Sequence, residues 1–220
     1  MQRRIISIVI IILVLCAYAF LNSSYFSLDE LEWSGLTFLA PSDLLAETSY
    51  AGRNVFRIDK GELAEQIRGH IWIKDAAVAW KWPNHLSVKV TERKPVALVA
   101  GSDSWFVLDD EGVVLPPPRG FNFGSLPLVT NIDLDAGEQF ISIARLLAQL
   151  PTGLYENVSE WNSLEQTLIT RAGTQILLGN LRDLDRKLAA LDLILQELAK
   201  RSAVPKRIDL RVANSPVIIE

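Results

Sequence analysis

The chain has 220 residues, a formal net charge of −4 and 49% hydrophobic residues. This length and composition allow one large or two small domains, each with a real apolar core. No basic tract interrupts the sequence, which argues against a nucleic-acid partner. Cys16 is the only cysteine, so neither a disulfide framework nor thiolate chemistry is expected outside the N-terminal segment.

The N-terminus consists of a short basic tail followed by an apolar run. Residues 1–4 read MQRR, and residues 5–21 read IISIVIIILVLCAYAFL without a charged side chain. As a helix this run is roughly 26 Å long, at the short end of what a bilayer crossing requires. Arg3 and Arg4 precede the run and the next basic residue is Arg53, so the positive-inside rule places the N-terminus in the cytoplasm and the rest of the chain outside. We expect a retained anchor that contacts the lipid bilayer through residues 5–21.

Two other interpretations of this segment stay open. Ala17-Tyr18-Ala19 imitates the small-x-small cleavage site of a signal peptide, although the apolar run exceeds the usual length of about 7–15 residues. Lipid attachment at Cys16 is disfavoured because the bulky Leu15 stands where a small residue would be expected.

The next segment alternates between extended and helical patterns. FSLDELEWSG predicts a strand with a slip in its period, beginning at Phe26. PSDLLAETSY predicts a short helix with Ser42 as its N-cap. KGELAEQIRGH predicts a second helix, whose inward stripe consists of Leu63, Ala64 and Ile67.

A β-hairpin is predicted from the stretch VAWKWPNHLSVKV. Val78, Trp80 and Trp82 share one face of the first strand, and Pro83-Asn84 provides the turn. The apolar residues of the second strand are Leu86, Val88 and Val90. We interpret the hairpin as having one buried face, which completes a β-α-α-β-β unit of about 70 residues.

After Pro95 the pattern changes to short strands and two amphipathic helices. Hairpins are predicted at Asp109-Asp110-Glu111-Gly112 and at Arg171-Ala172-Gly173. The helix in DAGEQFISIARLLAQL has an inward apolar stripe, as does the helix over Asp183–Arg201. RIDLRV and PVIIE close the chain as strands. The sequence therefore predicts an α+β fold class, with an N-terminal membrane helix and a second, mixed β domain.

No constellation of residues points to catalysis. His70 and His85 are interpreted as solvated turn histidines, since a zinc site would need further ligands at short spacing. The sequence DDEG lacks the alternating ligands of a calcium loop and is interpreted as an exposed acidic turn. The six tryptophans are interpreted mainly as core or cross-strand packing. No catalytic, cofactor-binding or metal site and no small-molecule substrate is predicted.

In their order and spacing, several stretches resemble the bacterial cell-division family FtsQ/DivIB. The resemblance begins with the basic tail and the single apolar helix. The stretches that follow are FSLDELEWSG, AGRNVFRID, IKDAAVAWKWPNHLSVKVTERKPVA, WFVLDDEGVVLP, LPLVTN, GTQILLGN and RIDLRV. The resemblance implies four parts. They are a cytoplasmic tail over 1–4, a transmembrane helix over 5–21, a POTRA domain over 26–95 and a β domain over 96–220.

The function that this resemblance implies is a non-enzymatic scaffold of the division septum. Such a protein is tethered to the cytoplasmic membrane, with its bulk in the periplasm or outside the cell, and holds the partner membrane proteins FtsB and FtsL. A membrane-anchored wall hydrolase or protease with an unrecognised site is the alternative. A POTRA-type envelope assembly factor is a third interpretation, but about 125 residues after Pro95 are too few for a 16-stranded barrel with its loops.

The resemblance also implies where a partner binds. In the family, FtsB adds a strand to the last strands of the β domain, and an apolar strand at a chain end is typical of a sheet edge. The residues expected to bind the partner are Leu210, Arg211, Val212, Val217, Ile218 and Ile219. Pro216 is compatible with an edge or a bulge and not with a central strand. The alternative is that this strand merely closes the core.

Overall fold

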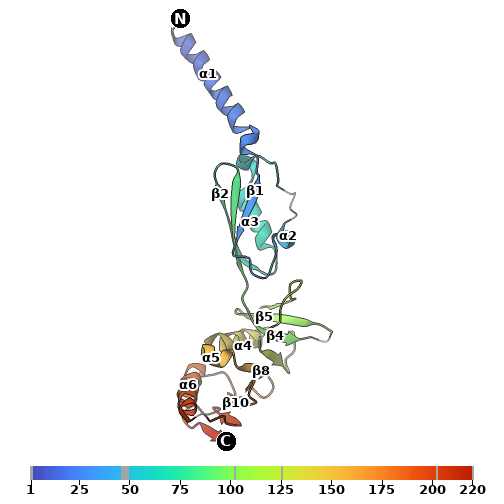
Figure 1. The fold of residues 1–220 in the computed structure, drawn as a ribbon, viewed down its shortest axis with the longest axis vertical. Helices are drawn as coiled ribbons and strands as arrows, with labels where there is room; N and C mark the ends of the chain where they lie inside the picture. Colours follow the sequence, from blue (N-terminus) through green and yellow to red (C-terminus); the bar gives the residue numbers. More distant parts are fainter. Residues whose placement is uncertain (1, 46–49, 102, 125, 202, 220) are drawn as a thin grey trace. The chain divides into compact units, whose positions relative to one another are not determined.

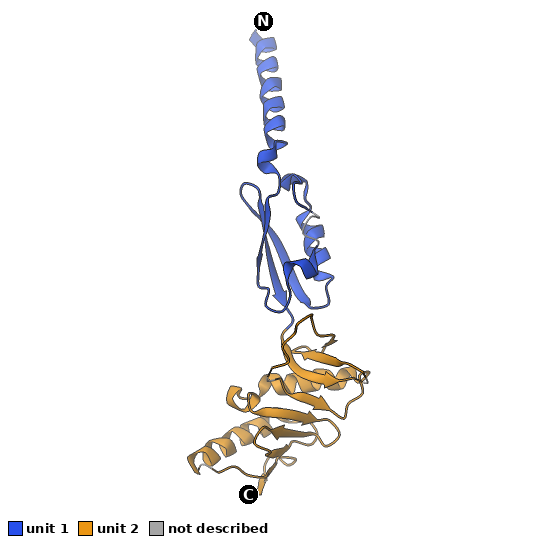
Figure 2. Ribbon diagram, turned by 45° about the vertical axis from the view of Figure 1, so that its right-hand side comes forward, with its two compact units in different colours: residues 1–93 blue, residues 94–220 orange. Residues whose placement is uncertain are grey.

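The structure is a computed structural model that describes residues 2–45, 50–101, 103–124, 126–201 and 203–219. It divides into two compact units, residues 1–93 and residues 94–220, which Figure 2 shows in different colours. Met1 and Glu220, the outer ends of the predicted tail and β domain, lie outside the described residues. Each unit combines helices with a sheet of its own. The predicted α+β fold class is therefore confirmed.

Unit 1 begins with the helix α1, Gln2–Leu21 (Figure 1). Twenty helical residues are about 30 Å long, which equals the thickness of the hydrocarbon core of a bilayer. None of its side chains is buried in the protein. Within the described ranges it is the one helix long and apolar enough to cross a membrane.

The remainder of unit 1 has the predicted order β-α-α-β-β, with two additional 3-10 helices. Its elements are η1 Ser24–Phe26, β1 Glu30–Ser34, α2 Pro41–Leu44, η2 Val55–Arg57, α3 Lys60–Arg68, β2 Ile73–Lys81 and β3 His85–Glu92. The sheet has the order β1-β3-β2, with β1 parallel and β2 antiparallel to the central β3. His85 therefore opens a strand opposite Lys81 instead of lying in the turn.

The apolar stripes predicted for α3 and β3 form the core of unit 1. Leu63 and Ile67 of α3 and Leu86 and Val88 of β3 are fully buried, because the helix lays its apolar face on the sheet. Two tryptophans of the hairpin, Trp80 in β2 and Trp82 directly after it, behave differently from the prediction. Trp80 and Trp82 remain exposed, and their rings contact each other and Phe56, while Trp82 also contacts the buried Phe26.

The first predicted helix is shorter than expected and has a different start. The helix α2 begins at Pro41, with Ala40 and not Ser42 at the N-cap position. The backbone N–H of Ala40 donates to the Asp43 carboxylate at 2.8 Å, which satisfies that amide at the helix start. Residues 46–49 of the predicted helix lie outside the described residues.

The loop after β1 is attached to the end of β3 by a single carboxylate. Backbone N–H groups of Thr37, Phe38 and Leu39 donate to the Glu92 carboxylate at 2.9, 2.8 and 3.0 Å. Gly35 precedes them at a positive φ of 88°, and a Cβ there would lie 2.1 Å from the Val90 carbonyl oxygen. Only glycine permits this approach, which brings the loop amides within reach of Glu92.

Glu92→Ala is expected to lower the free energy of unfolding of unit 1 by about 2–4 kcal/mol, since hydrogen bonds to a charged group contribute roughly 1.5–3 kcal/mol. Urea unfolding followed by circular dichroism measures the change. The matched control is Glu32→Ala, which removes an exposed ion pair with Lys81 and should cost less than about 1 kcal/mol. Equal losses in the two variants would contradict the role of Glu92.

Unit 2 is built on one nine-stranded sheet. Its strands are β4 Pro95–Ala100, β5 Trp105–Asp109, β6 Val114–Leu115, β7 Leu128–Thr130, β8 Val158–Asn162, β9 Thr167–Thr170, β10 Gln175–Leu177, β11 Arg207–Asp209 and β12 Val217–Ile219. They lie in the order β12-β11-β10-β9-β8-β7-β4-β5-β6. The pairs β4/β7, β7/β8 and β10/β11 are parallel, and the others are antiparallel. The strand β8 was not predicted from the sequence.

Three helices accompany this sheet: α4 Gly137–Gln149, α5 Thr152–Tyr155 and α6 Leu184–Arg201. The apolar stripes predicted for the two longer helices face a single core. Phe140 and Leu146 of α4 and Leu191 of α6 are buried there with Trp161 of β8 and Ile208 of β11. The helices thus cover the sheet and leave its two outermost strands, β12 and β6, at the edges.

Candidate functional site

The C-terminal strand β12 lies at an edge of the sheet of unit 2 (Figure 1). It pairs antiparallel with β11, with Ile218 opposite Ile208 and Val217 opposite Asp209. Its second side has no neighbouring strand within the described part of the chain. An edge of this kind presents backbone N–H and C=O groups to which another strand can hydrogen-bond.

The side chains of β12 are unusually exposed for their type. Val217, Ile218 and Ile219 expose 52%, 42% and 47% of their surface. Alternation in a half-buried strand would bury every second residue, yet none of these three is buried. Three consecutive half-exposed apolar residues on a free edge are typical of an interaction site.

The turn between β11 and β12 contains the other expected partner-binding residues. Leu210 is fully buried and its backbone N–H donates to the Leu177 carbonyl at 2.8 Å, so its side chain supports the core. Val212 is exposed, and its carbonyl accepts from the Ser215 N–H at 3.1 Å. The structure therefore places Arg211 and Val212 at the surface beside β12 and Leu210 inside.

Arg211 is held in place by Asp209. Its Nε donates to both carboxylate oxygens at 3.0 Å, and its Nη2 donates to Oδ2 at 2.6 Å. These side-chain hydrogen bonds lower the pKa of the Asp209 carboxyl below its usual value, despite the opposing effect of desolvation. The remaining guanidinium N–H groups stay available for a second carboxylate.

The Asp209–Arg211 pair predicts a pH-dependent stability. Because the folded-state pKa of Asp209 is lowered, its contribution is present above the unfolded pKa of about 3.9 and is lost as pH falls through the folded pKa. Arg211→Gln should therefore lower the unfolding midpoint at pH 6, and this difference should shrink as pH falls below about 4. Thermal unfolding of both proteins across this range measures it. A constant difference at all pH values would contradict the assignment.

A cleft of about 300 Å³ lies beside this turn. Its lining carries Arg182, Arg186 and Arg211 together with Asp183, so positive charge predominates. The sequence does not indicate this cleft, because Arg182 and Arg186 lie about 25–30 residues from Arg211 and neither forms a motif. A basic cleft next to an edge strand suits an acidic side chain of a bound peptide.

Lys187 also lines the cleft, but its side chain has a structural role. Its side chain is buried, and its ammonium donates to the carbonyls of Leu178 and Asn180 at 2.7 and 2.6 Å. Burial lowers the pKa of Lys187, while the charge of Asp183 opposes that change. The sequence analysis also overlooked this residue, because a lysine on a helix is normally exposed.

In the acidic turn DDEG, Asp110 and Glu111 are exposed as predicted, whereas Asp109 has a structural role that was not predicted. Asp109 is fully buried and accepts from the N–H groups of Glu111 and Val113 at 2.9 and 2.7 Å. It therefore closes the β5–β6 hairpin. Within the described ranges, no group of three or more His, Cys, Asp and Glu side chains is arranged to hold a metal ion.

Two family models match the chain in succession. Residues 26–93 match the POTRA domain, FtsQ-type, and residues 97–211 match the C-terminal region of the cell division protein FtsQ/DivIB. The resemblance inferred from the sequence is confirmed. The second match ends before β12, so the comparison leaves the partner-binding residues Val217, Ile218 and Ile219 as a prediction.

Individual proteins with similar sequences are also cell division proteins of the FtsQ or DivIB type. The cell division protein FtsQ of Myxococcus fulvus is 29% identical over 204 residues, which cover 86% of this chain and 71% of that protein. FtsQ of Bradyrhizobium diazoefficiens is 31% identical over 134 residues, covering 60% of this chain and 39% of that protein. The major extracytoplasmic domain of DivIB from Geobacillus stearothermophilus is 17% identical, with a TM-score of 0.31, over 39% of this chain and 76% of that one.

Proposed function

Because the chain belongs to the FtsQ/DivIB family of cell division proteins, we propose that it is a non-enzymatic scaffold of the division septum. The apolar helix α1 tethers it to the cytoplasmic membrane as a single-pass protein with its N-terminus in the cytoplasm. Units 1 and 2 lie in the periplasm or outside the cell. There the chain holds membrane division proteins of the FtsB and FtsL type.

The observation that carries this proposal is the free edge strand β12. A partner strand would add to it through main-chain hydrogen bonds, and the apolar side chains Val217, Ile218 and Ile219 would select the partner. This interaction needs no catalytic group. The enzyme alternative requires a convergent set of reactive side chains, which the chemistry of the described residues does not favour.

The basic cleft beside β12 refines the expected partner. An FtsB-type segment paired with β12 would extend toward Arg182, Arg186 and Arg211, so it should carry at least one carboxylate near the paired strand. Charge attraction at such a rim accelerates association and fixes the register of pairing.

Affinity purification of the full chain from detergent-solubilised membranes tests the proposal. Recovery of the FtsB-type and FtsL-type proteins, identified by mass spectrometry, is the expected result. Incubation of the purified chain with peptidoglycan and with peptide substrates tests the enzyme alternative. Substrate cleavage that copurifies with the chain, without recovery of those partners, would overturn the scaffold proposal.

Arg186→Glu is expected to weaken binding of the FtsB-type partner about tenfold, equivalent to about 1.4 kcal/mol. The difference should shrink at high salt, because exposed charges are screened. Arg119→Glu is the matched control, since Arg119 is an exposed arginine of the same unit away from the cleft. Equal affinities of the two variants for the partner would show that the cleft is not part of the interface.

A further inference from the structure

Six aromatic side chains gather in unit 1 where the helix α1 meets the sheet-containing part. This aromatic cluster consists of Phe20, Tyr25, Phe26, Phe56, Trp80 and Trp82. Phe26 is at its centre, with ring-centroid distances of 5.2 Å to Phe20, 5.0 Å to Phe56 and 5.7 Å to Trp82. Trp80 joins the cluster through its contact with Phe56, with a ring-centroid distance of 4.6 Å.

Most of this cluster is exposed although it is apolar. Phe26 is buried, whereas Tyr25 and Trp82 expose 58% and 66% of their surface. Trp72 and Trp161, by contrast, are almost completely buried in the two cores. The cluster therefore does not serve the core, and a patch of this kind indicates an interaction surface.

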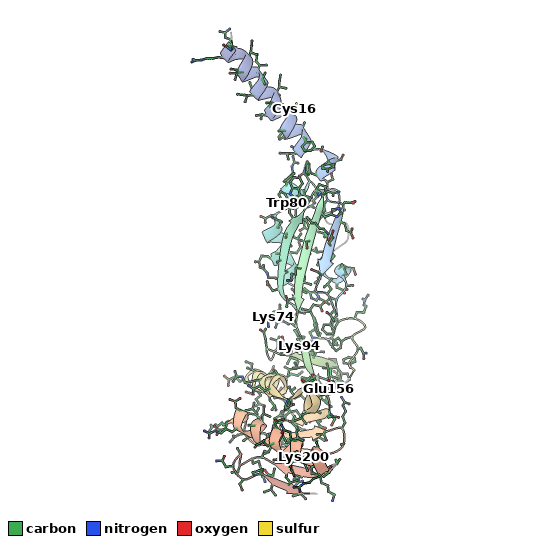
Figure 3. All side chains as sticks on the ribbon, turned by 60° about the vertical axis from the view of Figure 1, so that its left-hand side comes forward. Cys16, Lys74, Trp80, Lys94, Glu156 and Lys200 are labelled. Atoms are coloured by element: carbon green, nitrogen blue, oxygen red, sulfur yellow. The ribbon has the colours of Figure 1, made fainter. Side chains whose placement is uncertain are left out.

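The cluster is joined to the last turn of α1. The Asn54 side-chain amide, next to Phe56, donates to the Leu21 carbonyl at 2.6 Å. The Arg57 guanidinium donates to the Asn22 side-chain oxygen at 2.6 Å. Trp80, labelled in Figure 3, lies at the end of the sheet of unit 1 that is nearer to this helix. These bonds attach the segment that carries Phe56 to the end of α1, and Phe20 of α1 is itself one of the rings of the cluster.

We infer that the aromatic cluster docks into the headgroup region of the bilayer that α1 crosses, on the side of the membrane where the sheet of unit 1 lies. The inference rests on the membrane anchoring contained in the proposed function. If α1 spans the hydrocarbon core, the layer immediately beyond Leu21 is the headgroup region, about 5–8 Å deep. Tryptophan and tyrosine favour that layer, because they combine an apolar ring with one polar group.

The charges around the cluster indicate what kind of lipid surface it fits. Lys60 Nζ lies 5.2 Å from the centre of the Trp80 ring, and Arg57 lies at the end of η2. Asp59 is the N-cap of the helix that begins at Lys60, and the cation between the two tryptophans, Lys81, is paired with Glu32 at 2.6 Å. Docking therefore depends on the rings and not on a positive patch, and vesicles of zwitterionic lipid should suffice.

The test uses the full chain reconstituted in phosphatidylcholine vesicles whose acyl chains are brominated near the headgroup. Bromine quenches tryptophans that lie in this layer. We expect quenching of the wild-type emission and its loss in the Trp80→Phe/Trp82→Phe variant. These substitutions keep an aromatic ring at both positions and so preserve the packing. Trp105→Phe, an exposed tryptophan of unit 2, is the matched control and should leave the quenching unchanged.

Flotation of the vesicles separates this inference from the proposed function. A chain that does not float with the vesicles overturns membrane anchoring and the docking together. A chain that floats but shows no quenching, or equal quenching in the double variant, overturns docking alone and leaves anchoring intact. Quenching only in vesicles that contain anionic lipid would overturn the aromatic basis of the docking. A cluster reserved for a protein partner would leave the emission unquenched in pure lipid.

Discussion

Val88→Asp is expected to unfold unit 1. Val88 is fully buried in the central strand β3, opposite Trp33 of β1 and Val78 of β2. An unpaired carboxylate at this position either loses its hydration or takes up a proton, and the cost after relaxation is about 4 kcal/mol or more. The part of unit 1 that follows α1, about 70 residues, typically has a total stability of only about 3–10 kcal/mol. The substitution therefore removes most or all of it.

Circular dichroism and limited proteolysis of the purified chain measure this effect. We expect unit 1 to be degraded and unit 2, which has its own core, to remain protected. Lys89→Asp is the matched control, because Lys89 is the next residue of the same strand and is exposed. It should cost only about 1 kcal/mol, the range of strand propensity. A folded Val88→Asp variant would show that the hairpin is not part of the core.

The fold was largely predictable where the spacing of apolar residues within a single helix or strand determines which face is buried. The stripe of Leu63 and Ile67 and the alternation of Leu86 and Val88 each follow from the repeat of one element, and all four are buried as expected. The strand β8, with the sequence VSEWN, was missed because only Val158 and Trp161 are apolar. Its strand identity comes from pairing with β7 and β9, which the local sequence does not reveal.

Features that join distant parts of the chain were less predictable. The exposure of Trp80 and Trp82 depends on their ring contacts near the end of α1, whereas strand alternation alone indicates a buried face. Glu92 carries no local sequence signal of its role, because it accepts hydrogen bonds from residues more than 50 positions away. The edge position of Val217–Ile219 was accessible from sequence because Pro216, directly before this apolar strand, is compatible with an edge or a bulge and not with a central strand.

Deletion of residues 215–220 is expected to weaken binding of the FtsB-type partner by at least about 100-fold, equivalent to about 2.7 kcal/mol. The deletion removes β12 and with it the edge to which a partner strand would hydrogen-bond. The three side chains of β12 are not buried, so the deletion takes little apolar surface from the core. Isothermal titration of the detergent-solubilised chain measures the affinity, and thermal unfolding measures the stability.

A triple variant separates the main chain from the side chains. Changing Val217, Ile218 and Ile219 to threonine keeps residues that favour a strand and retains all backbone N–H and C=O groups. It should therefore weaken binding less than the deletion does, since main-chain hydrogen bonds supply affinity and side chains supply specificity. Unchanged affinity after the deletion, in a protein that still folds, would mean that β12 only closes the sheet. A deletion variant that loses binding and stability together would likewise assign β12 to the core and not to an interface.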